Sequence, residues 1–297
     1  MKKVLVLGGT RFFGKQLVFK LLGEGHHVTL ATRGLTKDPF GSQVQRLVID
    51  RKEKRTLVKA FKNKRWDLVY DQSCFSSQEA LDTVEALRGK VKRYIFTSSQ
   101  AVYDFGTNHK EEEFDPLHYS ASQDHIPETM KYKRYQEGKR TAEQVLFKDD
   151  DFDVTAIRFP IVVGEDDHTE RLKFHVKRIL NHWPIGIERK ELRYSFISSD
   201  EAADFLFKIG ASSFIGAINP GCREDLSLAG LIHKIEAFTG MQANVTNEIT
   251  EDNKCVYELE GSCSINTDRA AWHGFTFSSI DQTFDPLIKY YCNQING

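Results

Sequence analysis

The chain of 297 residues lacks several features that would narrow its class. It contains no run of about 18 apolar residues, so the sequence predicts no membrane-spanning helix. Its five cysteines are scattered without a Cys-x-x-Cys pair, which argues against a disulfide framework or a zinc site. Neither charge dominates, with 41 basic and 42 acidic residues, so general binding to nucleic acid is not expected. We expect a cytoplasmic protein with no membrane partner.

What the chain does contain is a regular alternation of structure signals. Apolar residues make up 40% of it, enough to bury a sizeable core. Short apolar runs in the first half predict strands at 4–7, 28–31, 46–49, 67–70, 93–97 and 154–157. Helical periodicity between them predicts helices at 14–22, 78–87 and 135–147. This alternation indicates βαβ crossovers, and hence an α/β fold with a doubly wound parallel sheet of the Rossmann type.

The pattern changes after Gly164. We interpret residues 1–164 as a dinucleotide-binding domain and 165–297 as a smaller, mainly substrate-binding part, some of whose elements return to the sheet. This part has predicted helices at 170–180 and 226–238 and predicted short strands at 194–197 and 217–219. The polar stretch at about 104–131 is too long for an ordinary loop. Two interpretations of it stay open, a lid over the site and a disordered segment.

A glycine loop joins the first predicted strand to the first predicted helix. It has the sequence Gly8-Gly9-Thr10-Arg11-Phe12-Phe13-Gly14. Backbone N–H groups point outward at such a turn and the helix dipole favours an anion, so the loop can bind phosphate. Its position at the first βα turn indicates a dinucleotide site more strongly than the glycines do. The alternative is that the glycines only allow close packing of the helix on the strand.

This loop resembles the Gly-x-x-Gly-x-x-Gly fingerprint of the extended short-chain dehydrogenase/reductase family, the epimerase/dehydratase-like proteins. Gly8 and Gly14 take the outer places, and Arg11 takes the middle one. The sequence of residues 7–14 resembles that of an atypical branch of the family, which includes the chloroplast stem-loop-binding proteins. The resemblance implies that the cofactor is bound by Gly8, Thr10, Arg11, Phe12, Phe13 and Gly14.

The end of the second strand distinguishes NAD from NADP. A carboxylate there would bind the ribose 2′-hydroxyl, whereas an arginine accommodates a 2′-phosphate. The chain has Ala31-Thr32-Arg33-Gly34, and Arg11 could approach the same phosphate, so we favour NADP over NAD. A solvated loop cation is the alternative interpretation of Arg33. By the resemblance, Asp50 and Arg51 match the position that contacts adenine.

Tyr135 and Lys139 stand four residues apart in a predicted helix, so they share one face. Residues 135–146 resemble the active-site helix of the family well beyond this pair. A tyrosine has an ordinary pKa near 10, and a nearby ammonium favours its phenolate. Tyr135 would then exchange a proton with a substrate hydroxyl, and Lys139 would also hold the nicotinamide ribose.

The fifth strand ends in Ser98 and Ser99, within a segment similar to the Ser-Ser-x-x-Val-Tyr segment of the family. Ser99 falls at the catalytic serine or threonine position, where a hydroxyl would donate to the substrate oxygen. Ser98 is the alternative candidate for the catalytic serine, and we also predict that it contacts the cofactor. Two serines that only cap a turn are the alternative.

Pro160 lies in a segment similar to the Arg-x-Pro-x-x-x-Gly segment of the family, which borders the nicotinamide. Arg171 is a candidate contact for a substrate anion, and a surface salt bridge is an equal alternative. We expect no metal site, because His168, His175 and His182 recur every seven residues, a spacing that is poor for chelation.

These features predict an NAD(P)-dependent oxidoreductase, epimerase or dehydratase that transfers hydride at a carbinol or carbonyl carbon of a small molecule. Nucleotide sugars are the commonest substrates of the resembling family. The family also implies a homodimer through the helices at 78–87 and 135–147. The alternative hypothesis is a non-catalytic NADP-binding protein that senses redox state or binds RNA, although the basic residues at 131–140 lack an aromatic stacking platform.

Overall fold

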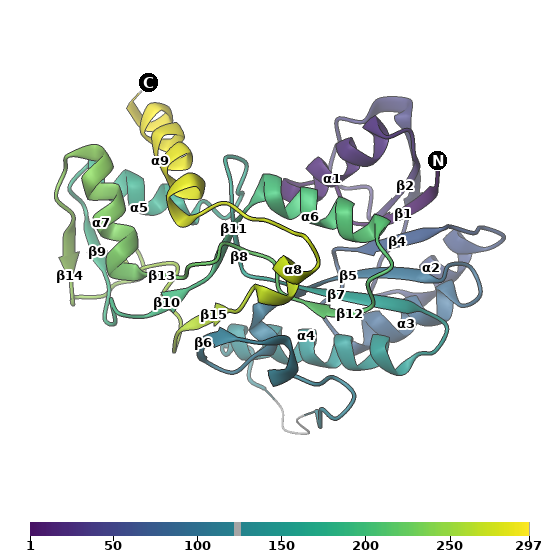
Figure 1. Cartoon of the computed structure of the whole chain (residues 1–297). Coiled ribbons are helices and arrows are strands. Elements are labelled where there is room, and N and C mark those ends of the chain that lie inside the picture. Colours follow the sequence, from purple (N-terminus) through teal and green to yellow (C-terminus); the bar gives the residue numbers. More distant parts are fainter. Residues whose placement is uncertain (122–125, 297) are drawn as a thin grey trace. The chain divides into compact units, whose positions relative to one another are not determined.

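The computed structural model describes residues 1–121 and 126–296 (Figure 1). The chain divides into two compact units, and it crosses between them several times. The first unit contains Met1–Val102, Glu111–Phe159 and Asp200–Asn219. The second unit contains Tyr103–Lys110, Pro160–Ser199 and Pro220–Gly297. Each unit is therefore assembled from segments that are distant in sequence.

A seven-stranded parallel sheet forms the centre of the first unit, which confirms the predicted α/β class. Its strand order is β12-β7-β5-β4-β1-β2-β3. The strands are β1 (Lys3–Leu7), β2 (His27–Thr32), β3 (Val44–Val48), β4 (Leu68–Asp71), β5 (Arg93–Ser99), β7 (Asp153–Phe159) and β12 (Gly216–Ile218). The order runs outward from β1 in both directions, so the winding reverses between β1 and β4. Parallel sheets of this kind bind ligands at the carboxyl ends of the strands beside that reversal.

Helices cover both faces of this sheet (Figure 1). Two of them, α1 (Phe12–Gly23) and α6 (Ser199–Ala211), lie on one face, and three lie on the other. Those three are α2 (Lys54–Phe61), α3 (Ser77–Leu87) and α4 (Lys131–Lys148). Buried side chains of α2, α3 and α4 pack with those of the sheet in one apolar cluster. The sequence did not predict helix α2, because only Leu57 and Phe61 of its eight residues are buried.

The second unit holds three small sheets. Strands β8 (Ile161–Val163) and β11 (Phe196–Ser198) form one parallel pair, and β9 (Pro184–Gly186) and β14 (Asn244–Thr246) form another. A four-stranded sheet has the order β13-β10-β15-β6. Its strands are β6 (Gly106–His109), β10 (Arg193–Tyr194), β13 (Leu226–Ser227) and β15 (Cys263–Ile265).

The helices of the second unit enclose a separate apolar core. They are α5 (Arg171–Leu180), α7 (Leu228–Thr239), α8 (Asp268–Trp272) and α9 (Ile280–Asn296). Val176, Ile235 and Ile288 are fully buried and place α5, α7 and α9 in one cluster. The described residues also form three short 3-10 helices: η1 (Gly41–Gln43), η2 (Gln100–Val102) and η3 (Glu111–Glu113). No helix within the described residues combines the length and apolar character needed to cross a membrane.

The polar stretch at 104–131 contains regular structure that the sequence did not predict. Strand β6 pairs in parallel with β15, a strand more than 150 residues later in the chain. Asn108 N also donates to the Ser264 hydroxyl at 2.9 Å. Most of this stretch is therefore built into the two units, while residues 122–125 lie outside the described part of the chain. The interpretation as a disordered segment does not hold for 104–121.

The packing of α6 on β4 gives a test of the fold. A Cβ on Gly210 would lie 1.9 Å from Tyr70 Oη, and the Tyr70 side chain is buried. We expect Gly210→Ala to lower the free energy of unfolding by about 1–3 kcal/mol, measured by denaturant titration. Gly23→Ala is the matched control, because a Cβ there meets no atom within 4 Å. Adding Tyr70→Phe should restore part of the loss, and unchanged stability of the Gly210→Ala variant would contradict this packing.

Candidate functional site

The turn between β1 and α1 requires its glycines. Gly8 and Gly9 have φ angles of 101° and 80°, in the region that favours glycine. A Cβ on Gly14 would lie 2.4 Å from Gln72 Oε1 and 3.1 Å from Gly9 Cα, so α1 can begin this close to the turn only with glycine. Arg11 is the N-cap residue of α1 and its side chain makes no capping bond. The helix dipole therefore favours an anion at an N-terminus that no side chain of its own neutralises.

The two phenylalanines of the loop have different surroundings. Phe12 has a φ of 49°, which is uncommon for a residue with a side chain, and its ring lies 5.5 Å from that of Phe13 between centroids. The Phe13 ring lies 5.5 Å from the ring of Phe159 at the end of β7. Phe13 thus packs α1 against the sheet.

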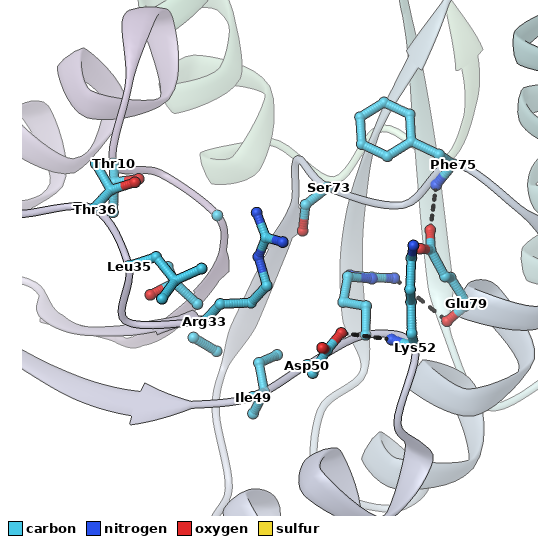
Figure 2. Close-up of a pocket in the computed structure, with 14 residues that line it drawn as sticks. Thr10, Arg33, Leu35, Thr36, Ile49, Asp50, Lys52, Ser73, Phe75 and Glu79 are labelled. Carbon is cyan, nitrogen blue, oxygen red and sulfur yellow. Dashed lines mark hydrogen bonds between the residues drawn. The ribbon is translucent and has the colours of Figure 1, made fainter.

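A cleft of about 300 Å³ opens at the carboxyl ends of β1 to β4 (Figure 2). It lies beside the reversal of winding, where sheets of this type bind ligands. Five residues that the sequence singled out line it: Gly8, Thr10, Arg33, Asp50 and Arg51. The other lining residues are Ala31, Thr32, Leu35, Thr36, Ile49, Lys52, Ser73, Phe75 and Glu79. Residues from four strand ends, distant in sequence, therefore meet in one cavity of the first unit.

Arg33 brings positive charge into this cleft. Its side chain is exposed and extends from the loop after β2 toward Ser73 (Figure 2). Among the residues that the structure describes, Arg33 has no ion-pair partner. Arg11 Nη2 donates to Thr36 Oγ1 at 3.4 Å, and Thr36 also lines the cleft. Arg33 and Arg11 therefore both approach the loop after β2, and their contact with a 2′-phosphate remains a prediction.

Arg51 lines the cleft, but the protein itself holds its guanidinium. Nη1 donates to the buried Asp71 carboxylate at 2.7 Å, and Nη2 donates to Thr83 Oγ1 at 3.0 Å. Burial opposes the charge of Arg51, yet Asp71 outweighs it and holds the pKa of Arg51 above its usual value. Asp71 also accepts from the Tyr94 hydroxyl. Arg51 thus joins the end of β3 to β4 and α3, while Asp50 is the carboxylate beside it that the cleft exposes.

Lys139 is buried on α4, with 2% of its surface exposed. Its Nζ donates to the carbonyl oxygens of Cys74 and Thr97, each at 2.8 Å. These bonds hold the ammonium between the loop after β4 and the end of β5. The ring centroid of Phe75 lies 4.6 Å from Nζ, and that of Phe96 lies 4.9 Å from it. Lys139 is thus enclosed by two carbonyls and two aromatic rings.

Tyr135 lies one helical turn before Lys139, at the surface. Its ring centroid is 5.8 Å from Lys139 Nζ and 6.2 Å from the ring centroid of Phe75. The structure therefore brings Tyr135 and Lys139 together on one face of α4. Ser99 ends β5, two residues after Thr97, and its Oγ accepts from Ala101 N at 3.2 Å. The Ser99 hydroxyl is half-buried and caps the turn that follows, and its catalytic role remains a prediction.

Ser98 is turned to a different set of partners. Its buried hydroxyl donates to the Glu143 carboxylate, which also pairs with Arg158 Nη2 at 2.7 Å. Glu143 and Arg158 are fully buried. Arg158 also donates to the carbonyls of Glu111 and Phe114, at 2.8 Å and 3.0 Å. This network fixes α4, β5, β7 and the 111–114 segment to one another, and we did not predict it from the sequence.

Two predicted site residues belong to the second unit. Pro160 is buried between β7 and β8, where a Cβ on Gly221 would lie 3.1 Å from its ring. Arg171 begins α5, and its Nε donates to Thr169 Oγ1 at 2.9 Å and lies 3.9 Å from Asp167 Oδ2. The contact of Arg171 with a substrate anion remains a prediction.

Of the three histidines spaced by seven residues, His175 is fully buried. Its Nδ1 lies 2.8 Å from the Arg171 carbonyl and its Nε2 lies 3.2 Å from Cys255 Sγ. Burial lowers the pKa of His175 to about 4, so the ring stays neutral at pH 7. The described residues contain no group of three or more metal-ligating side chains.

Comparison with known proteins identifies the family. The model of the NAD dependent epimerase/dehydratase family matches residues 4–210. The chain belongs to this family. The resemblance seen in the sequence is thereby confirmed, and the coarse class is that of NAD-dependent epimerases and dehydratases.

Solved structures of similar fold match this chain over almost its whole length. The UDP-glucose 4-epimerase of Thermus thermophilus, in complex with NAD, is 18% identical with a TM-score of 0.76 over 98% of this chain and 99% of that one. The dTDP-glucose 4,6-dehydratase of Bacillus anthracis, in complex with NAD, is 12% identical with a TM-score of 0.74 over 100% and 98%. At these identities the likeness shows the fold, and it confirms the Rossmann type.

A curated relative is closer in sequence over a shorter stretch. The Chloroplast stem-loop binding protein of 41 kDa b of Arabidopsis thaliana is 37% identical over 117 residues. The match covers 34% of this chain and 30% of the relative. The aligned part is thus less than a third of the relative's length.

The buried pair of Glu143 and Arg158 yields a stability prediction. Glu143→Gln keeps the shape of the side chain but leaves the Arg158 charge buried without a carboxylate. We expect it to lower the free energy of unfolding by about 3–5 kcal/mol, measured by denaturant titration. Arg88→Ala, which breaks the surface pair with Asp149, is the control and should cost at most about 1 kcal/mol. Equal losses in both variants would show that the buried network does not stabilise the first unit.

Proposed function

We propose that this protein is a dinucleotide-dependent enzyme that oxidises or reduces a carbinol or carbonyl carbon of a small molecule, in the course of epimerisation, dehydration or reduction. The observation that carries the proposal is that the glycine-turn cleft and the Tyr135–Lys139 pair lie at neighbouring strand ends of the same sheet. The cleft adjoins the end of β4. Lys139 donates to the carbonyl of Cys74, in the loop after β4, and to the carbonyl of Thr97, near the end of β5. Binding and proton transfer would therefore take place at adjacent strand ends.

The residues present fit a dinucleotide. A Cβ would crowd the turn at Gly9 and Gly14, and the positive φ of Gly8 favours glycine there. The turn lies beside an uncapped helix N-terminus suited to a pyrophosphate. The cleft between Arg33 and Asp50 would take the adenosine half. When bound, the nicotinamide accepts or supplies the hydride.

The chain's own groups would handle the proton. Tyr135 and Lys139 lie on one face of α4, with Lys139 Nζ 5.8 Å from the centroid of the Tyr135 ring. Tyr135 would then take the proton of the substrate hydroxyl in oxidation and return it in reduction. Ser99 is the last residue of β5, two residues after Thr97, and its hydroxyl would donate to the substrate oxygen.

We propose a nucleotide sugar as the substrate class. Support comes from the family model and from the solved structures of similar fold, whose names include UDP-glucose 4-epimerase and dTDP-glucose 4,6-dehydratase. Arg171 of the second unit, half-exposed at the start of α5, is our candidate for contact with a substrate phosphate.

We further propose that NADP is preferred over NAD. The loop after β2 carries Arg33 and no carboxylate, and Arg11 approaches the same loop. An arginine at this place suits a 2′-phosphate, which NAD lacks. The two solved relatives named above are complexes with NAD, so the preference rests on this chain's own residues.

A second candidate function is RNA binding, favoured by the name of the Arabidopsis relative. RNA binding would need exposed basic residues at 131–140, and the structure leaves fewer of them exposed than the sequence contains. Lys139 is buried, and Arg140 Nε donates to the Val102 carbonyl at 2.7 Å. Only Lys131, Lys133 and Arg134 remain exposed. The enzyme is therefore our first proposal.

Replacing Tyr135 tests the enzyme proposal. Tyr135→Phe removes the hydroxyl and should lower kcat by about 100-fold or more, because general acid–base catalysis contributes about that much. Product formation from a panel of nucleotide sugars and carbonyl compounds, followed by chromatography, measures turnover, because epimerisation and dehydration return the hydride and leave NADPH absorbance unchanged. NADPH calorimetry should show unchanged binding. Full activity of the variant would refute the assigned site. If wild-type protein transfers no hydride over the panel but binds a stem-loop RNA in a gel-shift assay, the second candidate replaces the first.

Replacing Arg33 tests the cofactor preference. Arg33→Ala should weaken NADP binding by about 10- to 100-fold, the value of a lost charge-assisted hydrogen bond, and leave NAD binding unchanged. Lys37→Ala is the matched control, since Lys37 is an exposed cation on the same loop but does not line the cleft. Calorimetry with both dinucleotides measures the effect. Tighter binding of NAD than NADP by the wild type would overturn the role of Arg33.

A further inference from the structure

The surroundings of Lys139 leave little room for a ligand. Two of the three N–H groups of its ammonium donate to the carbonyls of Cys74 and Thr97. The remaining surface of Nζ faces three aromatic rings, with the centroids of Phe75, Phe96 and Tyr135 at 4.6 Å, 4.9 Å and 5.8 Å. With 2% of the residue exposed, a ribose hydroxyl reaches the third N–H only if one wall of this enclosure moves.

Phe75 is the most exposed of the three rings around Nζ, ahead of Tyr135 at 37%. Phe96 lies within β5 and is fully buried, whereas 51% of Phe75 is exposed. An exposed aromatic ring changes rotamer easily, while a ring in a close-packed core does not. Phe75 also lines the cleft, and Figure 2 shows it beside Ser73 and above Glu79. One residue thus borders the cleft and covers Lys139.

The main chain of Phe75 is held firmly, so the movement is confined to the side chain. Phe75 N donates to Glu79 Oε2 at 2.7 Å. A Cβ on Gly138 would lie 2.1 Å from Phe75 O, so the loop and α4 are in close contact at this glycine. The preceding carbonyl, of Cys74, is held by Lys139. The loop is pinned from α3 and from α4, and only the ring is free to turn.

We propose that the Phe75 side chain is a gate between the dinucleotide cleft and Lys139. The inference rests on the proposed function and adds to it a residue that controls access of the nicotinamide half. The adenosine half binds in the cleft without displacement of the ring. The nicotinamide ribose then binds Lys139 after the ring has turned away. Binding of the whole dinucleotide therefore has a step that binding of its adenosine half lacks.

Chemical labelling of Lys139 tests the enclosure without a cofactor or turnover. The protein is treated with an acetylating ester of N-hydroxysuccinimide, and modification of each lysine is followed by mass spectrometry. Phe75→Ala should increase the rate of Lys139 modification about tenfold or more, because the wild-type amine reacts only when the enclosure opens. Phe19→Ala is the matched control, since Phe19 is a phenylalanine of similar exposure, 48%, on α1. Equal protection of Lys139 in all three proteins would overturn the gate.

Binding kinetics test the gate as a step. NADPH fluorescence in a stopped-flow instrument should give a rate that saturates with NADPH concentration in the wild type and rises linearly in Phe75→Ala. The adenosine fragment 2′,5′-ADP should bind the wild-type protein at a rate that rises linearly with its concentration, because its binding does not require the ring to turn. Identical linear kinetics in both proteins would overturn the gate while leaving the proposed function intact. Failure of both proteins to bind NADPH and 2′,5′-ADP would overturn the proposed function itself, and the gate with it.

Discussion

The bonds from Lys139 Nζ to the carbonyls of Cys74 and Thr97 are the interaction on which the candidate site depends. They tie α4 to the loop after β4 and to β5, three segments that are distant in sequence. An ammonium buried without partners would be very costly, so the two carbonyls are needed to keep it there. The same bonds hold a positive charge beside Tyr135 and place the Phe75 loop at the edge of the cleft. One side chain thus ties together the helix that carries Tyr135 and the loop that borders the cleft.

Two buried ion pairs supply the frame around this lysine. Arg51 and Asp71 join β3 to β4 on one side, and Arg158 and Glu143 join β7 to α4 on the other. Loss of one partner leaves a buried charge, which is far more costly than loss of a surface pair. The strand ends that would hold the dinucleotide are therefore fixed by charges within the protein. This explains why Arg51, although it lines the cleft, is a residue of the scaffold.

Part of the site could be predicted because its signals are local. A glycine loop after a short apolar run, and a tyrosine and lysine at helical spacing, depend only on residues that are close in sequence. The partners of these residues are not local. Glu143 and Arg158 gave no signal as a pair, because their contact joins a helix to a strand through the core. Phe75 was missed for the same reason, since its position after a strand does not reveal that it covers Lys139.

The sequence by itself determined the α/β class, the first six strands of the sheet and the residues that carry the candidate chemistry, because periodicity and turn residues act over a few positions. Only the tertiary structure decided that β6 pairs with β15, that α6 and β12 join the first unit, and that Ser98 faces Glu143. These outcomes depend on which buried polar groups form hydrogen bonds with one another across long stretches of chain. Such pairing is set by burial and hydrogen-bond partners in space, which no short sequence window contains.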